Sequence, residues 1–421
     1  MGVQHLPGEL TGRMPDHLIG RAAKVLESRL LGLARISDER GRLTRTFLSP
    51  AMRRTNRQVG AWMREAGLHV REDDVGNLVG RTGGRAGQTF LLGSHLDTVR
   101  NAGRFDGALG VLLPICALGV LRARGVKLPF AVEVIGFSEE EGVRFSSGYL
   151  GSKGFLGRLT KRDLSLLDAD GVSVADSLRR ARLSPHRKLP RRILGYLEAH
   201  IEQGPVLEDE GLALGVVSVI SGQTRARAVF SGRAGHAGTT PMRLRRDALA
   251  GASEFILAAE ALARRTAGLV ATVGCLDVSP GASNVIPGGA ALTVDVRHPA
   301  DARRRDAVRR LRRKGREIAK GRGLSFSMKV VQDGDTVACS GALSARLAAS
   351  VRRQQGRSLS IPSGAGHDAV VVSQVAPVAM LFVRCRKGLS HHPDEHVSRA
   401  DLRSALAATV DFLSSLRPGR P

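Results

Sequence analysis

The chain has 421 residues, 42% of them hydrophobic, and its 64 Lys and Arg against 39 Asp and Glu give a net charge of +25. This length exceeds what one hydrophobic core serves, so we expect two domains. No apolar run approaches the ~20 residues that cross a bilayer, which excludes an integral membrane protein and predicts a soluble one. Residues 1–17 lack a basic region followed by an apolar run, so we expect no secretion signal and a cytoplasmic location.

The sequence pI of about 11.3 raises the alternative of a basic, nucleic-acid-binding protein. Much of the excess charge lies at 179–192 and 303–316. In the second run the apolar residues Ala307, Leu311 and Ile318 recur at helical spacing, which predicts an amphipathic helix with its arginines in solvent. Only 4% of residues are aromatic, so little is available to stack on bases. We therefore favour attraction of small anions over nucleic-acid binding.

The first part of the chain alternates predicted helices and strands. Residues 16–67 hold two helical patterns, the second from Pro50 to Ala66, and a strand pair follows at 68–80. The next elements are a strand entering GSHLDTV at 90–92, a helix at 107–124, a strand at 130–137 and a strand at 196–200. This order is typical of a wound α/β sheet, whose ligands bind at the carboxyl ends of the strands.

From 217 to 332 the predicted order is strand, helix, strand, strand, helix, strand, which is the ferredoxin-like pattern. The strands are expected at 224–230, 269–276, 290–297 and 325–331, and the helices at 241–263 and 302–320. The α/β pattern then resumes with elements at 343–353, 378–383 and 399–416. We therefore expect an α/β fold in which a wound mixed-sheet catalytic domain, 1–216 and 333–421, is interrupted by an inserted ferredoxin-like domain at 217–332.

Five segments contain nearly all of the suggestive His, Asp and Glu. They are GSHLDTV (93–99), RFDGALG (104–110), FSEEEGVRF (137–145), LEAHIEQGP (197–205) and GLSHHPDE (388–395). A lone His at a strand end is more often a hydrogen-bonded structural residue than a ligand. Together, however, such residues at several strand ends are what a binuclear hydrolytic site requires: a bridging carboxylate, further ligands for each metal, and another carboxylate to carry a proton.

With these motifs in this order, from about residue 20 to the C-terminus, the chain closely resembles the two-metal aminoacylase and carboxypeptidase superfamily. Within it, the chain resembles the allantoate amidohydrolases and N-carbamoyl-L-amino-acid amidohydrolases. The resemblance implies two divalent metal ions per subunit, with Asp106 bridging both. His95 and His200 would complete one metal site, and Glu141 and His391 the other. Mixed His and carboxylate ligands accept Zn²⁺, Mn²⁺ or Co²⁺, and zinc or manganese is favoured.

The resemblance also assigns roles to residues that are not ligands. Glu140 would be the general base, and Asp97 would hold the His95 ring by its other nitrogen. Glu139 stands where relatives often carry Asp or Asn, a departure that leaves the chemistry intact.

The inserted domain resembles a lid and dimerisation domain, which implies a homodimer. Its motifs are GRAGHAGTTPM (232–242), SNVIPGG (283–289) and DVRHP (295–299). By resemblance, His236 would stabilise the oxyanion in the partner's site, and Asn284 and Arg297 would bind the substrate carboxylate. Gln203 and, from SGAGHDA, His367 would add polar contacts. Without the family, the glycine-rich segments would be interpreted as turns.

These features predict hydrolysis of a ureido or carbamoyl amide in a small carboxylate substrate, with neither nucleic acid nor membrane as partner. Residues 133–145, 220–225 and 380–395 look more like allantoate amidohydrolases, so we favour conversion of allantoate to ureidoglycine (ureidoglycolate), ammonia and CO2. N-carbamoyl-L-amino acids and ureidoglycolate-type compounds remain alternative substrates. A basic binding protein or an inactive homologue remains the alternative that is not an enzyme.

Overall fold

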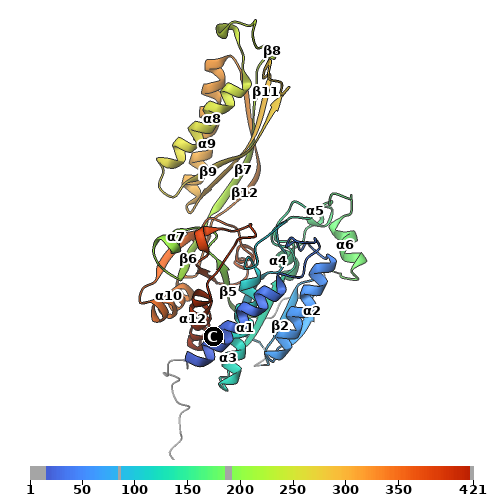
Figure 1. Ribbon diagram of the computed structural model, residues 1–421, viewed down its shortest axis with the longest axis vertical. Helices are drawn as coiled ribbons and strands as arrows, with labels where there is room; N and C mark the ends of the chain where they lie inside the picture. The colour runs from blue at the N-terminus through green and yellow to red at the C-terminus, as the bar shows by residue number, and fades with distance from the viewer. Residues whose placement is uncertain (1–15, 84–86, 185–191, 418–421) are drawn as a thin grey trace, which may run out of the picture. The chain divides into compact units, whose positions relative to one another are not determined.

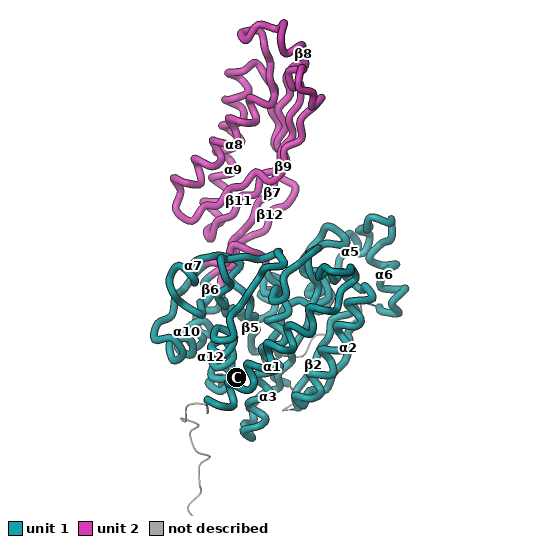
Figure 2. The backbone as a smooth tube through the Cα atoms, in the orientation of Figure 1, with its two compact units in different colours: residues 1–218, 339–361, 367–421 teal, residues 219–338, 362–366 magenta. Residues whose placement is uncertain are grey.

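The computed structural model describes residues 16–83, 87–184 and 192–417. The chain divides into two compact units: unit 1 comprises residues 1–218, 339–361 and 367–421, and unit 2 comprises 219–338 and 362–366 (Figure 2). The N-terminal segment in which we expected no secretion signal, and the middle of the Arg-rich connection at 179–192, lie largely outside the described residues. Among the described helices, none combines the length and the apolar character needed to cross a membrane.

Unit 1 is built on a mixed sheet. Its strands are β1 (His69–Glu72), β2 (Leu78–Arg81), β3 (Thr89–His95), β4 (Ala131–Phe137), β5 (Ile193–Ile201), β6 (Leu214–Ile220), β14 (Leu359–Ser363) and β15 (Val378–Val383). The spatial order is β1-β2-β4-β3-β5-β15-β6, and β14 also pairs with β6. The central strands β4, β3, β5 and β15 are parallel, whereas β2 and β6 are antiparallel to their neighbours β4 and β15. This confirms the predicted central mixed sheet in an α/β protein.

Helices of unit 1 include the predicted ones, with small shifts at their ends. They are α1 (Asp16–Leu33), α2 (Pro50–Glu65), α3 (Ala108–Ala123), α4 (Leu150–Phe155), α5 (Lys161–Leu164), α6 (Val174–Arg180), α7 (Val206–Asp209), α10 (Gly341–Gln355), α11 (Ala369–Val372) and α12 (Arg399–Ser415), with the 3-10 turn η2 (Arg386–Gly388). The α2 helix begins where Ser49 accepts the N–H of Met52 and Pro50 occupies the first turn.

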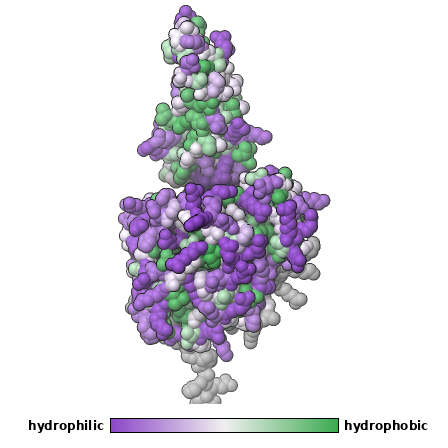
Figure 3. Space-filling view, turned by 45° about the vertical axis from the view of Figure 1, so that its right-hand side comes forward, coloured by the Kyte–Doolittle hydropathy of each residue, from purple (hydrophilic) through white to green (hydrophobic). Residues whose placement is uncertain are grey.

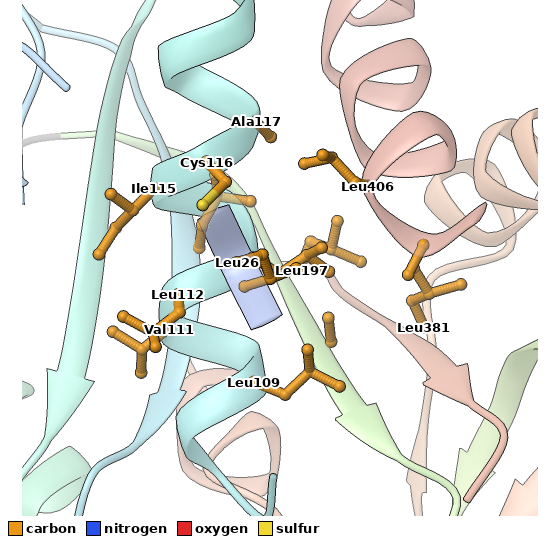
Figure 4. Packing of buried hydrophobic residues seen from close by; sticks show 14 of the residues in the cluster. Leu26, Leu109, Val111, Leu112, Ile115, Cys116, Ala117, Leu197, Leu381 and Leu406 are labelled. Atoms are coloured by element: carbon orange, nitrogen blue, oxygen red, sulfur yellow. The ribbon is translucent and has the colours of Figure 1, made fainter. Parts of the chain in front are cut away.

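The α3 helix is the centre of the unit 1 core. It is apolar on all sides and almost entirely buried, and it contacts α1, α12 and β3. Figure 4 shows its side chains among Leu26 of α1, Leu197 of β5, Leu381 of β15 and Leu406 of α12. Burying one such leucine contributes about 2 kcal/mol. The start of α3, which Gly107 joins to Asp106, is therefore fixed against the sheet.

The parallel strands bring the motif residues to one edge of the sheet. His95 ends β3 and is in register with Phe137, the last residue of β4. His200 lies near the end of β5, in register with Phe382 of β15. Because parallel strands present their carboxyl ends at the same edge, the loops after β3, β4, β5 and β15 meet there (Figure 1).

Unit 2 contains a four-stranded antiparallel sheet in the order β12-β7-β11-β9. Its elements are β7 (Gly222–Ser231), α8 (Ala248–Arg264), β9 (Val270–Ser279), β11 (Gly289–His298), α9 (Asp301–Arg322) and β12 (Ser325–Gly334), with η1 (Met242–Leu244), the short pair β8 (Gly235–His236) and β10 (Val285–Ile286), and β13 (Val337–Ala338) beside the end of β6. Residues of α8 and α9 share one hydrophobic core with alternate residues of the strands. In α9 the predicted apolar face is confirmed, because Ala307, Leu311 and Ile318 are buried.

The helix predicted at 241–263 begins later than expected. Met242–Leu244 form a separate 3-10 turn, and Arg245 is extended. Asp247 then starts α8 by accepting the N–H of Ala250. An Asp at the N-cap satisfies a free backbone donor, and this local signal outweighed the apolar periodicity.

Candidate active site

Asp106 lies at the centre of the carboxyl edge of unit 1, where it is only 3% exposed. Its Oδ1 is 3.1 Å from Nε2 of His200 and 3.6 Å from Nε2 of His95, while its Oδ2 is 3.2 Å from Nε2 of His391. Nε2 of His391 is also 3.3 Å from Oε1 of Glu141. The two oxygens of one carboxylate therefore face two separate sets of nitrogen and oxygen atoms.

The backbone allows this approach only because glycine follows Asp106. Gly107 has a φ of +65°, and a Cβ built on it would lie 2.4 Å from the His95 ring. Two other residues beside Asp106 adopt the left-handed conformation without being glycine: Gln203 with φ 58° and His391 with φ 56°. Such conformations cost about 1 kcal/mol or more each and concentrate at functional sites.

The imidazole tautomers at this centre suit a cation. Nδ1 of His95 is 3.0 Å from the carbonyl oxygen of Asp97, and Nδ1 of His200 is 2.9 Å from that of Ile201. A carbonyl only accepts, so each Nδ1 carries a proton, and the neutral form of each ring turns an Nε2 lone pair toward Asp106. Oδ1 of Asp106 receives no well-formed hydrogen bond from any residue in the described ranges. Lone pairs facing a buried carboxylate oxygen are the arrangement that a divalent cation satisfies.

Electrostatics lead to the same conclusion. Burial would lower the pKa of His95 and His200, but contact with Asp106 and the charges of other nearby carboxylates together outweigh burial and raise both values. Contact with Asp106 and Glu141 raises the pKa of His391 to about 10. Burial opposes ionisation of Asp106, yet the three histidines hold its pKa well below the usual range. Positive charge on the histidines thus stabilises the cluster of carboxylates. A bound cation would supply that positive charge in place of the protons.

Three groups of potential ligand atoms are found among the described residues, each within 4.8 Å: His95, Asp106 and His200; Asp106, Glu141 and His391; and His95, Glu140 and Glu141. The first two match the two metal sets that the resemblance implies, and they share Asp106. Burial, with the nearby carboxylates of Glu141, Asp368 and Asp97, raises the pKa of Glu140 well above its usual value. A carboxyl group with raised proton affinity beside both groups is suited to general-base chemistry.

Asp97 lies beside the other nitrogen of the His95 ring, where the resemblance places it, and its main-chain oxygen is the nearer group. Nδ1 of His95 is closer to the main-chain oxygen of Asp97, at 3.0 Å, than to its Oδ1, at 3.5 Å. The carboxylate instead accepts the N–H of Glu140 at 3.0 Å and that of Glu141 at 3.1 Å. The turn after β3 places the carbonyl next to the ring, so Asp97 orients His95 through its backbone and the glutamates through its side chain.

Of the expected substrate contacts in unit 1, Gln203 faces the centre. Its Nε2 donates to Oγ of Ser390 at 2.9 Å and lies 3.5 Å from Oδ2 of Asp106. His367 is 1% exposed, and its ring packs edge-on against His200 with centroids 4.6 Å apart. Burial and the neighbouring His200 hold its pKa well below the usual value, so the ring is neutral. The immediate neighbour of His367 is thus a candidate ligand.

The three expected residues in unit 2 fall into two places. His236 and Asn284 lie together, because β8 pairs with β10 and the N–H of Ala237 donates to the carbonyl of Asn284 at 2.9 Å. Nδ1 of His236 accepts the N–H groups of Gly238 and Thr239 at 3.0 and 3.2 Å, which leaves Nε2 as the protonated donor of the neutral ring.

Arg297 lies at the other end of β11, opposite Gln223 of β7. Its guanidinium makes two bonds of 2.9 Å to Asp295 and donates to the carbonyl of Gly364 at 2.7 Å. From Gly289, beside the His236 end, to Arg297 the strand extends ~27 Å at ~3.4 Å per residue. One small molecule therefore cannot contact both His236 and Arg297 of the same chain.

Sequence reasoning missed two polar residues at the centre. Oγ of Ser390 lies 3.3 Å from Oδ2 of Asp106. Glu395, 2% exposed, accepts the N–H groups of Phe105 and Asp106. Both belong to the segment GLSHHPDE, but nothing in their spacing indicates which side chains reach Asp106.

Comparison with known proteins gives consistent matches over nearly the whole chain. Residues 91–415 match the sequence profile of Peptidase family M20/M25/M40. The chain is 39% identical to allantoate deiminase 2 of Glycine max, covering 92% of this chain and 88% of that protein. It is 38% identical to an N-carbamoyl-L-amino acid amidohydrolase of Geobacillus stearothermophilus, covering 89% and 94%.

Among solved structures, a hydantoinase/carbamoylase family amidase from Burkholderia multivorans superposes with a TM-score of 0.86 at 33% identity, covering 93% of this chain and 97% of that one. The family profile spans most of the chain, and its relatives exceed 30% identity over nearly their full lengths. The chain belongs to Peptidase family M20/M25/M40, in the branch that contains amidohydrolases for allantoate and for N-carbamoyl amino acids.

Proposed function

We propose that this protein is a two-metal amidohydrolase that cleaves a ureido or carbamoyl amide of a small carboxylate, with allantoate as the leading substrate. The observation that carries the proposal is Asp106, whose two oxygens face separate groups of candidate ligands. The allantoate deiminases of plants, at 39% identity, support the choice of substrate. Allantoate and water would yield ureidoglycine, ammonia and CO2, and the ureidoglycine would give ureidoglycolate when a second water replaces its amino group and ammonia is released.

His95 and His200 with Asp106 would hold one cation, and Glu141 and His391 with Asp106 the other. Zn²⁺, Mn²⁺ or Co²⁺ would suit these ligands. When bound, the two cations supply Lewis-acid polarisation of the amide carbonyl and lower the pKa of water.

The proton transfers fall to Glu140. Its carboxylate takes a proton from the attacking water as the new C–O bond forms at the carbamoyl carbon, and returns it to the departing nitrogen as the C–N bond breaks. The Nε2–H of His236 donates a hydrogen bond to the developing oxyanion. The carbamate released then decomposes to ammonia and CO2.

Arg297 binds the substrate carboxylate through paired N–H groups, with Asp295 fixing the plane of the guanidinium. Asn284 adds an amide contact from the His236 end. Because this end and Arg297 lie ~27 Å apart on one chain, the two ends would serve one substrate only if they came from two protomers.

A homodimer would meet this requirement, with unit 2 as the inserted ferredoxin-like lid and dimerisation domain expected at 217–332. Unit 2 exposes several large hydrophobic side chains, as Figure 3 shows for the face in view. They include Leu257, Val270, Leu276 and Val331. Such side chains on α8 and on the edge strands β9 and β12 would be available to an interface between protomers.

N-carbamoyl-L-amino acids are the second candidate substrates, because a relative that is 38% identical carries that name. The test is ammonia release from allantoate, N-carbamoyl-amino acids and ureidoglycolate after loading with Mn²⁺ or Zn²⁺. Turnover of allantoate ahead of the others would support the leading assignment. Absence of ammonia from all three substrates, in protein shown to hold two cations, would overturn it and favour a basic binding protein or an inactive homologue.

A further inference from the structure

Glu395 joins two loops of the candidate active site that are far apart in sequence. It lies four residues after His391 and is 2% exposed. Its Oε1 accepts the N–H of Phe105 at 2.7 Å and that of Asp106 at 3.0 Å, across sequence separations of 290 and 289 residues. We propose that Glu395 is a positioning residue that holds the backbone of Asp106 and thereby aims both of its carboxylate oxygens. The inference rests on the proposed metal-binding role of Asp106.

Close packing shows that this contact is built into the loop. A Cβ on Gly103 would lie 2.4 Å from Cβ and Cδ of Glu395 and 2.6 Å from its Oε1. Glycine at 103 is therefore needed for Glu395 to reach the N–H groups. On its own loop, the N–H of Glu395 donates to the carbonyl of His392 at 3.1 Å. Glu395 is thus held by its backbone on its own loop and by its carboxylate on the loop of Asp106.

The geometry shows that Glu395 positions Asp106 and is not itself a candidate metal ligand. Glu395 belongs to none of the candidate ligand groups formed by the described residues, whereas Asp106 belongs to two of them. A displacement of the Asp106 backbone would move Oδ1 away from His200 and Oδ2 away from His391 at once. We therefore expect that loss of Glu395 weakens both cation sites together. Removing a residue that orients a metal ligand typically lowers affinity about 10- to 100-fold.

The chemistry of the contact predicts which substitutions are tolerated. Oε1 acts as an acceptor of two backbone N–H groups, and Gln keeps an acceptor oxygen of the same reach. Glu395→Gln should therefore retain cation affinity within about threefold, whereas Glu395→Ala should lose about 10- to 100-fold at both sites. A residue acting through negative charge would fail equally in both variants.

The experiment measures the affinity of the purified full-length protein for Mn²⁺ and Co²⁺ by chelator competition, together with the visible spectrum of the Co²⁺ form. Asp247→Ala is the control, since the Asp247 carboxylate likewise accepts a backbone N–H, that of Ala250 at 3.0 Å, and belongs to unit 2 and to none of the candidate ligand groups. Asp247→Ala should lower the melting temperature and leave cation affinity and the Co²⁺ spectrum unchanged.

Gly103→Ala provides a second test that leaves the carboxylate in the protein. The new Cβ at position 103 would displace Glu395, so Gly103→Ala should weaken cation binding by about the 10- to 100-fold expected for Glu395→Ala. This second variant keeps the inference testable if Glu395→Ala does not fold. Gly119→Ala is the control, because a Cβ there meets nothing within 4 Å. Wild-type affinity in Glu395→Ala or Gly103→Ala, or equal losses in the Gln and Ala variants, would overturn the inference. Failure of the wild-type protein to bind either cation would instead overturn the proposed function on which it rests.

Discussion

The carboxylate of Asp97 accepts the backbone N–H of Glu140 at 3.0 Å, and its other oxygen accepts that of Glu141 at 3.1 Å. One side chain after β3 thereby fixes the loop after β4, which carries both the proposed base and a proposed ligand. Asp97→Ala should lower kcat by about 100-fold, because small displacements of reacting groups cost this much. Asp97→Asn keeps one acceptor oxygen and should fall between Ala and wild type. Steady-state kinetics would disprove the assignment by showing an unchanged kcat for the Ala variant.

Glu140→Gln should abolish measurable turnover, since removal of a general base costs about 10²- to 10⁴-fold. Gln preserves size but cannot take up a proton from water. Metal content, measured by atomic emission after dialysis, should stay at the wild-type ratio because Glu140 lies outside the two sets that share Asp106. Robust activity in this variant would show that another group carries the proton.

Gly107→Ala should weaken cation binding and lower the melting temperature. The new Cβ would press on the His95 ring from 2.4 Å, and the φ of +65° is one that Ala rarely adopts. Gly341→Ala is the control, since its Cβ would meet nothing within 4 Å. Isothermal titration with Mn²⁺ tests both variants, and equal affinities would contradict the packing argument.

Arg297→Lys should raise KM for a carboxylate substrate about tenfold or more, with a smaller change in kcat. Lysine keeps the charge but loses the paired N–H groups that match two oxygens. The control is Arg225→Lys, because Arg225 contacts the same Asp295 at 3.1 Å from the neighbouring strand but has no proposed contact with substrate. An unchanged KM for Arg297→Lys would remove Arg297 from the binding site.

Unit 2 should become less stable in acid, because aspartates that pair with a buried arginine would be protonated there. Arg304 is 0% exposed and ion-pairs with Asp301, Asp333 and Asp335. Burial opposes ionisation of Asp301 and Asp333, but hydrogen bonds outweigh it, those from Arg304 prominent among them, and lower the pKa of both. Their contribution to stability is therefore complete above the ordinary Asp pKa of about 4 and is lost as the pH falls through the lowered values.

Arg304→Met tests this network. We expect it to destabilise unit 2 by about 2 kcal/mol at pH 7, less than the ~3–5 kcal/mol of a fully buried pair because the carboxylates reach solvent. The stability of the variant should also depend less on pH below about 4. Hydrogen exchange of β7 and β12 at pH 7 and at pH 3.5 measures both effects, and identical protection in variant and wild type would refute them.

Local signals in the sequence were enough to predict much of the fold. Pro50 after Ser49 marks the start of α2, and the apolar run after Gly107 predicts α3 within one residue at each end. The predicted start of α8 was wrong, because Asp247 caps the helix at Ala248 although the apolar periodicity begins earlier in the sequence. Strand β6 was not predicted, since its pairing with β15 is a long-range contact between short apolar segments.

The candidate site also contains residues that the sequence could predict and contacts that it could not. Residues such as His95 and Asp106 could be proposed because their motifs carry chemically distinctive side chains at strand ends. The bonds that the Asp97 and Glu395 carboxylates accept from backbone N–H groups could not be predicted, because nothing in the residues next to such a carboxylate indicates that it will accept them. Whether a glutamate in GLSHHPDE faces solvent or Asp106 depends on a loop that lies nearly 300 positions earlier.

The ladder between β7 and β11 separates His236 from Arg297. In the proposed homodimer this separation means that two inactive variants can complement each other in a mixed dimer. His236→Ala and Arg297→Ala homodimers would each lack an essential group in both sites. A mixed dimer would contain one site with both groups intact and one with neither. Unfolding and refolding an equal mixture of two inactive proteins should then restore about a quarter of wild-type activity.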